Sequence, residues 1–306
     1  LHSFPTRRSS DLMTYEPGST FKIITLASSI EEKTIDLFKD TFTDSGSINV
    51  EGATLHCWKH GGHGTQTYLE VVENSCNPGF VSMGQKLGTQ KLMSYIKSFG
   101  FGKKTGIDLN GESKGIIFSL DKVGPLELAT TGFGQGVSVT AIQQVTAVSA
   151  IVNNGNMYTP FVVKSISDYE TGTILKETTP TLKSKNLITK DTSNMVKYAL
   201  ESVVANGSGH NAYIEGYRIG GKTGTAQKVG SDGKYMIGNY ILSFIGFIPA
   251  NDPEYVVYIA IDGAKGATQY GGSTSAPIAK SIFNSIISLY DLKSTTNGMP
   301  REYFCP

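Results

Sequence analysis

The sequence has few of the residues that define several classes of protein. Only three of its 306 residues are cysteine, at positions 57, 76 and 305, which excludes a disulfide-rich scaffold and a four-thiolate metal site. No apolar run approaches the roughly 18 residues that span a bilayer. The 27 basic and 26 acidic side chains leave a formal net charge of +1, without the basic excess typical of nucleic-acid-binding proteins. We therefore expect no nucleic-acid partner.

What the sequence does contain is enough apolar material for a large core. Hydrophobic residues make up 39% of the chain, which excludes disorder for most of it. The length predicts one large domain or two ordinary ones. The composition as a whole is typical of a globular protein of mixed α/β class.

The first twelve residues, LHSFPTRRSSDL, have neither a helical nor a strand period. The stretch from Phe4 to Leu12 matches the translation of a sequencing-library adapter. We therefore expect residues 1–12 to be a disordered artefact, the natural protein to start at or before Met13, and its true N-terminal part to be missing.

Apolar periodicity and turn residues predict alternating helices and short strands from there on. Pro17-Gly18-Ser19-Thr20 reads as a helix start, because apolar residues recur at helical spacing after it. The expected helices are 68–74, 80–87, 91–99, 141–153, 191–206 and 276–290. The expected strands are short ones within 41–66, a hairpin over 159–176 with its turn at 170–172, and strands at 217–228, 240–248 and 255–262.

Three short motifs suggest chemistry, but each occurs more than once. Ser-x-x-Lys places a hydroxyl one helical turn from an amine, within reach for an amine to take the proton of a serine nucleophile. It occurs at Ser19/Lys22, Ser94/Lys97, Ser119/Lys122 and Ser231/Lys234. Ser-x-Asn occurs at Ser47/Asn49 and Ser75/Asn77, and Lys-Thr-Gly at 104–106 and 222–224. Each isolated match is weak evidence.

Context separates the copies. Ser19 lies at the start of an apolar helix, whose N-terminal partial charge disfavours the ammonium form of Lys22 and aims backbone N–H groups at an oxyanion. Ser75-Cys76-Asn77 lies at a break between two predicted helices. The Lys-Thr-Gly at 222–224 opens an extended segment bounded by glycines, as an edge strand lining a cleft would. The copy at 104–106 lies in a glycine-rich loop, and we interpret it as structural.

The order Ser-x-x-Lys, Ser-x-Asn, Lys-Thr-Gly resembles the penicillin-recognising serine transpeptidases. The strings EPGSTFK, ENSCNPGF, GFGQGVSVTAIQ and GGKTGTAQ together resemble the class B penicillin-binding proteins of division and sporulation. CWKHGGHGTQ and NSCN are most similar to the sporulation branch. The resemblance covers residues 13–292, leaving 293–306 as a tail. It implies one transpeptidase domain of the β-lactamase-like α/β (α+β) fold, an antiparallel sheet flanked by helices, here without its N-terminal strands.

The resemblance also implies roles for individual residues. Ser19 would form the acyl-enzyme and Lys22 would be its general base. Ser75 would relay protons to the leaving amine, and Asn77 would bind the donor peptide and steady Lys22. The substrate carboxylate would be bound by the segment Lys222, Thr223, Gly224 and Thr225, and the backbone N–H groups of Ser19 and Thr225 would form the oxyanion hole.

Substrate, partners and location follow from the same resemblance. The donor would be a peptidoglycan stem peptide ending in D-Ala-D-Ala, and β-lactams would acylate the same serine. No cofactor and no metal are expected. The expected protein partner is a glycosyltransferase of the shape, elongation, division and sporulation family. The domain would face the outside of the bacterial membrane, held by an N-terminal anchor missing from this sequence.

Cys57 and Cys76 allow two interpretations, since most free cysteines are simply buried thiols. Outside the cytoplasm they could instead form a redox pair that shifts Ser75 and Asn77, with a thiol–disulfide oxidoreductase as a partner. His56, His60 and His63 have metal-like spacing, but the glycines around them favour a loop over a zinc site.

The same motifs are also compatible with other functions. A β-lactamase needs a base that activates water, and no suitable glutamate is evident. A D,D-carboxypeptidase differs only in its acceptor, and a penicilloyl sensor binds covalently without turnover. An inactive gene fragment is the remaining alternative: without N-terminal strands, the last three strands would expose an unpaired edge, so the chain expressed alone is expected to be poorly soluble or inactive.

Overall fold

A computed structural model describes residues 10–230, 233–266 and 269–294 of the chain. Cys305, the remainder of the predicted tail and residues 1–9 of the adapter-like segment lie outside the described residues. Of the twelve residues predicted to be disordered, Ser10 to Leu12 form a turn that contacts the domain. The Ser10 and Asp11 carbonyls accept hydrogen bonds from the backbone N–H groups of Ile142 and Ser113.

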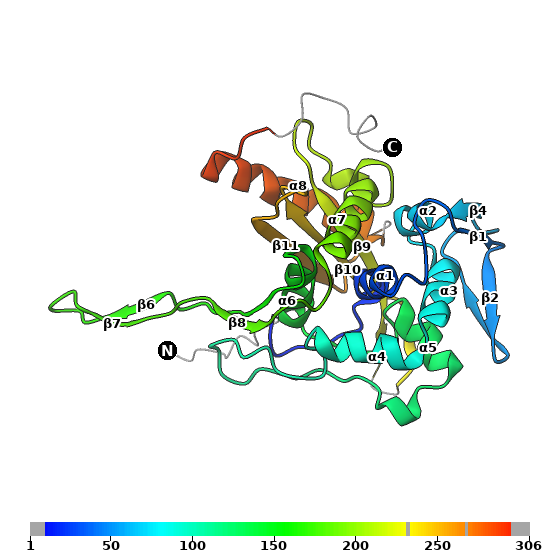
Figure 1. The fold of residues 1–306 in the computed structure, drawn as a ribbon, viewed down its shortest axis with the longest axis horizontal. Coiled ribbons are helices and arrows are strands. Elements are labelled where there is room, and N and C mark those ends of the chain that lie inside the picture. The colour runs from blue at the N-terminus through cyan, green and yellow to red at the C-terminus, as the bar shows by residue number, and fades with distance from the viewer. Residues whose placement is uncertain (1–9, 231–232, 267–268, 295–306) are drawn as a thin grey trace.

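A three-stranded antiparallel sheet forms one side of the molecule (Figure 1), in the order β11-β10-β9. Its strands are β9 (Gly220–Val229), β10 (Tyr235–Ile248) and β11 (Tyr255–Asp262). Side chains alternate across the central strand: Phe244 and Ile248 pack against α8 (Gly271–Tyr290), while Ile245 and Phe247 join the main core. Among the described residues β11 pairs with β10 alone.

Helices form the other side, around a buried central helix. In α1 (Lys22–Glu31) every residue from Lys22 to Ser29 is buried, because α1 packs against helices on several sides. Figure 1 shows it in the middle of the molecule. The surrounding helices are α2 (Tyr68–Glu73), α3 (Asn77–Leu87), α4 (Thr89–Ser98), α5 (Pro125–Gly132), α6 (Ala141–Val152) and α7 (Lys190–Ala205). The sequence periodicity did not predict α5.

Two small antiparallel pairs lie beside α2 and α3. The pair β1 (Thr41–Asp44) and β4 (Gly64–Thr67) encloses the hairpin of β2 (Ser47–Val50) and β3 (Ala53–His56). These strands bring the Gly- and His-rich segment predicted as loop with short strands against the start of α3.

A long hairpin arm projects from the domain (Figure 1). Its base is β5 (Met157–Thr159) paired with β8 (Thr181–Ser184), and its tip is β6 (Ser165–Ser167) paired with β7 (Ile174–Glu177). The predicted turn at 170–172 is confirmed, with Gly172 at a φ of 69°. The hairpin extends further toward both ends than the pattern of alternation predicted.

No helix among the described residues is long and apolar enough to cross a membrane.

Candidate active site

Ser19 lies in a 3-10 turn that leads directly into α1. The turn, η1 (Gly18–Thr20), is tied to a glycine loop by a 3.0 Å hydrogen bond from the Gly18 N–H to the Gly134 carbonyl. A Cβ at Gly134 would lie 2.0 Å from the Gly18 carbonyl oxygen, so only glycine fits there. Ser19 is half-buried, and no described residue hydrogen-bonds its hydroxyl. The fold thus presents a rigidly held serine with a free hydroxyl.

Lys22, one turn after Ser19, reaches into the break between α2 and α3. Its Nζ lies 2.8 Å from the Ser75 carbonyl oxygen, 3.2 Å from Ser75 Oγ and 2.7 Å from Asn77 Oδ1. These described contacts join the first two motifs directly, whereas the expected contact between Lys22 and Ser19 is not among them. A neutral amine has two N–H donors and one lone pair, so it can donate to the two carbonyl oxygens and accept from the Ser75 hydroxyl.

The surroundings of Lys22 favour that neutral form. The residue is completely buried, and its Nζ lies 5.0 Å from the centre of the Phe80 ring. Burial lowers the pKa of Lys22 from 10.5 to about 7, although Cys76 and Cys57 oppose the shift. An amine with this pKa can take a proton near neutral pH.

The Ser75–Asn77 segment holds its position through backbone geometry. Ser75 has a φ of 52°, in the left-handed region, and this turns the chain sharply between α2 and α3. Cys76 caps α3 by accepting a hydrogen bond from the Gly79 N–H. Asn77 Nδ2 donates to the His56 carbonyl at the end of β3. The second motif is therefore fixed from both sides.

The third motif lies on β9, where the strand passes close to η1. A Cβ at Gly224 would meet Ser243 Oγ at 2.3 Å and Thr20 Cγ2 at 3.1 Å, so glycine allows the close approach. Lys222 is fully buried, and burial together with the Lys22 charge holds its pKa well below the usual range. Thr225 Oγ1 accepts a hydrogen bond from the Gly271 N–H at the start of α8.

Ser208 is a site residue that the sequence patterns missed. Its hydroxyl lies 3.1 Å from Thr223 Oγ1, and its backbone N–H donates to the Glu73 carbonyl at the end of α2. It thereby connects the second and third motifs. The available signal was its position just after Gly207, which ends the predicted helix over 191–206.

The duplicate motifs lie elsewhere. Ser94 and Lys97 are exposed on α4. Ser119 and Lys122 are also exposed, at a short 3-10 turn over Leu120–Lys122. The Ser47/Asn49 copy lies on β2, and Ser231 falls outside the described residues. Lys104–Gly106 lies in a loop, as predicted, where Thr105 binds the Glu112 carboxylate.

The two cysteines lie together in a cluster beside the second motif. Cys57 and Cys76 are both buried free thiols. Their interaction lowers the pKa of Cys57 and raises the pKa of Cys76, so that Cys57 is the more acidic thiol of the pair. Asp44 and His63 complete the cluster, while His56 and His60 are exposed and outside it. The redox pairing stays a prediction, now with both thiols in one place.

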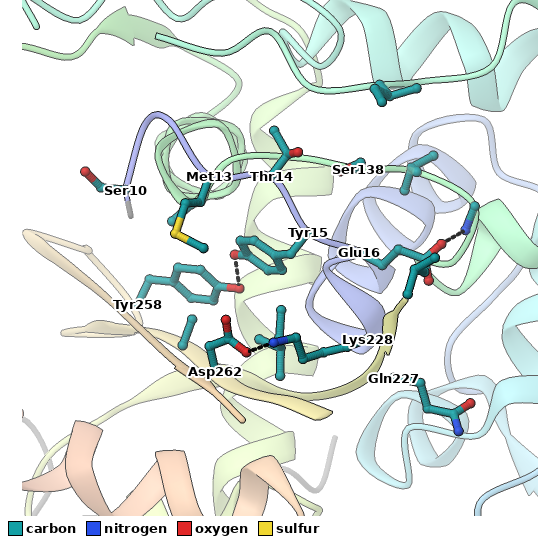
Figure 2. Close-up of a pocket in the computed structure, with 17 residues that line it drawn as sticks. Ser10, Met13, Thr14, Tyr15, Glu16, Ser138, Gln227, Lys228, Tyr258 and Asp262 are labelled. Atoms are coloured by element: carbon teal, nitrogen blue, oxygen red, sulfur yellow. Dashed lines mark hydrogen bonds and ion pairs between the residues drawn. The ribbon is translucent and has the colours of Figure 1, made fainter. Parts of the chain in front are cut away.

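The pocket in Figure 2 is separate from these motifs. It has a volume of about 710 Å³ and lies between the segment 13–16 and the strands β9 and β11. Tyr15 and Tyr258 share a hydroxyl hydrogen bond in it, and Lys228 pairs with Asp262 at 2.6 Å. None of the predicted site residues lines it, so the motifs and not this pocket define the candidate site.

Known proteins share the sequence of this chain over most of its length. The profile of the penicillin binding protein transpeptidase domain family matches residues 10–284. The chain is 58% identical over 290 residues to stage V sporulation protein D of Bacillus subtilis, covering 95% of this chain and 45% of that protein. It is 31% identical over 315 residues to the peptidoglycan D,D-transpeptidase FtsI homolog of Mesostigma viride, covering 95% and 52%. The chain thus spans about half the length of the curated relatives it matches.

A solved structure shares the fold. Penicillin binding protein 3 of Mycobacterium tuberculosis, complexed with ampicillin, superposes with a TM-score of 0.84 at 28% identity. The match covers 95% of this chain and 66% of that one. The similarity confirms the expected sheet flanked by helices.

Proposed function

This chain belongs to the penicillin-binding protein transpeptidase domain family, and on that premise we propose that Ser19 carries the acyl group during peptidoglycan cross-linking. The observation that carries the proposal is the buried Lys22 amine, one turn from Ser19, which contacts both Ser75 and Asn77. Two motifs that are 53 residues apart share one hydrogen-bonded centre there.

The acylation half-reaction begins with attack by Ser19 Oγ on the carbonyl carbon of the penultimate D-alanine. The hydroxyl proton passes to neutral Lys22, and the carbonyl oxygen becomes an oxyanion held by the backbone N–H groups of Ser19 and Thr225. The C–N bond then breaks, and the terminal D-alanine leaves with a proton relayed through Ser75. The product is an ester on Ser19.

The second half-reaction transfers the acyl group to an amine. An amino group of a second stem peptide attacks the ester, loses its proton to Lys22, and displaces Ser19 as the free alcohol. The result is a peptide cross-link and a regenerated enzyme. A β-lactam acylates Ser19 by the same attack, but the ring-opened product stays attached.

The carboxylate of the donor peptide is placed by β9. Lys222 supplies positive charge when protonated, and the hydroxyls of Thr223 and Thr225 donate hydrogen bonds. Ser208 positions Thr223 through the 3.1 Å contact between their hydroxyls. We place this reaction on the outer face of a bacterial membrane, where the peptidoglycan substrate is found, with a cell-wall glycosyltransferase as a partner. The similarity to the sporulation protein favours a role in sporulation over one in division.

Covalent labelling tests the nucleophile. The protein, produced from its complete gene, is incubated with a fluorescent penicillin, denatured and separated by electrophoresis. We expect the unmodified chain to be labelled and Ser19→Ala to lose labelling completely. Ser94→Ala is the matched control, because it removes the serine of an exposed copy of the same motif and should leave labelling unchanged. Labelled Ser19→Ala, or an unlabelled but folded unmodified chain, contradicts the proposal.

Product analysis separates transpeptidation from the related activities. A donor peptide ending in D-Ala-D-Ala is supplied with an amine acceptor, and the products are identified by mass spectrometry. A transpeptidase yields the amide-linked dimer. Release of D-alanine with hydrolysis alone indicates a carboxypeptidase, and penicillin labelling without any peptide product indicates a sensor.

A further inference from the structure

Four side chains with metal-ligating atoms converge beside the Ser75–Asn77 segment. Asp44 ends β1, Cys57 follows β3, His63 precedes β4, and Cys76 caps α3. One ligand atom from each lies within 4.8 Å of all the others. Because Asp44, the loop that holds Cys57 and His63, and Cys76 are three separate segments, the fold and not local sequence brings them together.

The contacts within this cluster leave room for one small ion. His63 Nδ1 lies 2.9 Å from Asp44 Oδ2 and 3.4 Å from Cys57 Sγ, and Cys76 Sγ lies 3.3 Å from the same Asp44 oxygen. In a tetrahedral zinc site with bonds of about 2.0–2.3 Å, ligand atoms are separated by about 3.3–3.8 Å. Shifts of less than about 1 Å would therefore convert the cluster into such a site.

The chemistry of the four groups selects the metal. Two sulfurs and an imidazole nitrogen suit zinc and disfavour magnesium and calcium, which prefer oxygen ligands. The side chains of Asp44 and His63 are 0% and 5% exposed, so the site is closed to solvent in the manner of structural zinc sites.

Asp44 is a buried carboxylate that accepts hydrogen bonds from the backbone N–H groups of Gly46 and His63 and from the Cys76 thiol, and a zinc ion would add the positive charge that these neutral donors lack. A buried carboxylate is costly unless it is paired, and His63 is the only ion-pair partner of Asp44 among the described residues. His63 presents Nδ1 to the cluster, whereas its buried Nε2 has no hydrogen-bond partner in the described structure. The histidine thus directs its one engaged nitrogen at the three other ligands.

We propose that Asp44, Cys57, His63 and Cys76 bind a single zinc ion that fixes the Ser75–Asn77 segment against Lys22. Binding converts each thiol to a thiolate and releases its proton to solvent. Cys76 lies between the two residues that contact Lys22, and Cys57 follows His56, whose carbonyl holds Asn77. The metal site was not expected from the sequence, which favoured a plain loop for the histidines.

Zinc binding and the predicted disulfide exclude each other, because both use the same two sulfurs. Zinc would keep the thiols reduced and the segment in place, and a Cys57–Cys76 bond would remove two of its four ligands. The effect on catalysis rests on the proposed function, whereas the metal binding itself does not.

Metal analysis of the protein produced from its complete gene tests the site. Reduced protein is loaded with zinc, freed of loosely bound metal by gel filtration, and assayed by mass spectrometry for elements. We expect about one zinc per chain. Cobalt loaded instead should give thiolate-to-cobalt charge-transfer absorption in the near ultraviolet. Reduced, folded protein with neither zinc nor that absorption overturns the proposal.

Variants assign the ligands. We expect His63→Ala to bind zinc at least about tenfold more weakly in competition with a chelator. His60→Ala is the matched control, since it removes an exposed histidine three positions earlier and should bind zinc normally. Equal affinity in the two variants contradicts the assignment, and if His63→Ala does not fold, the cobalt absorption of the unmodified chain decides.

The effect of zinc on the active site is measured separately, as the rate of acylation by penicillin. We expect metal-free protein to react with penicillin about tenfold more slowly than the zinc form, and re-addition of zinc to restore the rate. Ser19→Ala should bind zinc normally while losing penicillin labelling. Zinc binding without labelling in the unmodified chain would thus refute the proposed function alone, and labelling at an equal rate with and without zinc would refute the positioning role.

Discussion

Lys-Thr-Gly occurs twice in this chain, and the two copies have opposite surroundings. Lys222 is completely buried on β9, beside η1 and Lys22, whereas Lys104 is exposed in a loop. The threonines differ in the same way. Thr223 contacts Ser208 at the junction of the motifs, while Thr105 is bound to the buried Glu112 carboxylate. The same three residues thus lie at the junction of the motifs in one place and stabilise a loop in the other.

The position of the strand β9, and not the three-residue motif alone, brings one copy next to the other motifs. The copy on β9 adjoins η1 because Gly224 permits close packing against Thr20. The loop copy has no such neighbour, and its threonine is occupied by an internal hydrogen bond. Substitutions made in pairs at the two copies should therefore separate catalysis from stability.

Replacing the two lysines should give the largest contrast. We expect Lys222→Ala to slow acylation by penicillin about 100- to 1,000-fold, because the ligand carboxylate favours the protonated form of Lys222 on binding, and the substitution removes that charge. Lys104→Ala should change the rate by less than about twofold, since exposed charges contribute little. Stopped-flow measurement of acylation checks both. Similar losses in the two variants would break the distinction between the copies.

The pH dependence of acylation comes next in size. Lys22 accepts a proton only when neutral, and burial lowers its pKa to about 7. The charged groups facing it are Lys222 on β9 and the thiols Cys76 and Cys57. The rate should therefore rise about tenfold between pH 6 and 8 and then level off. An amine with the ordinary pKa of 10.5 would instead give a rate still rising well above pH 8.

This profile needs a penicillin whose only ionisable group is its carboxylate, so that the ligand does not titrate in the same range. Ser94→Ala provides the control, since the exposed motif on α4 should leave the profile unchanged. A rate independent of pH between 6 and 8 would refute a Lys22 base.

The two threonines should show the smallest effects, of two different kinds. We expect Thr223→Val to slow acylation about threefold to tenfold, the value of one hydrogen bond, with little change in stability. Thr105→Val should leave acylation unchanged but lower the free energy of unfolding by about 1–3 kcal/mol, because buried Glu112 loses a donor. Thermal or urea denaturation measures the second effect. The comparison fails if both variants alter the same property.

Much of the fold could be predicted because it depends on local patterns. The Pro17-Gly18 turn and the apolar stripe after it predicted α1, which begins at Lys22. The predicted helix end at Asn206 agrees with α7, and the break between α2 and α3 was found, but its place was wrong: Asn77-Pro78-Gly79 forms the first turn of α3, because Pro78 is tolerated at a helix start. The helix α5 was missed, although Pro125 opens it, since its eight residues are too short for a clear apolar period.

The motifs of the site could be named from the sequence, but their contacts could not. Ser208 approaches Thr223 only because α7 ends beside β9. His63 was grouped with two other histidines by spacing, yet the structure places it with Asp44, Cys57 and Cys76 instead. Spacing along the chain carries no information on such contacts when the residues belong to different strands.

The sequence alone identified the family and the motif copies expected to act, because the order of the three motifs and the residues around them is specific to one family. The surroundings of each copy came from the tertiary structure, since packing buries Lys22 and Lys222 while leaving Lys97 and Lys104 exposed. Burial changes the charge state of an amine, and contact between distant segments creates a metal-binding cluster. Both depend on distances across the fold, which no local pattern encodes.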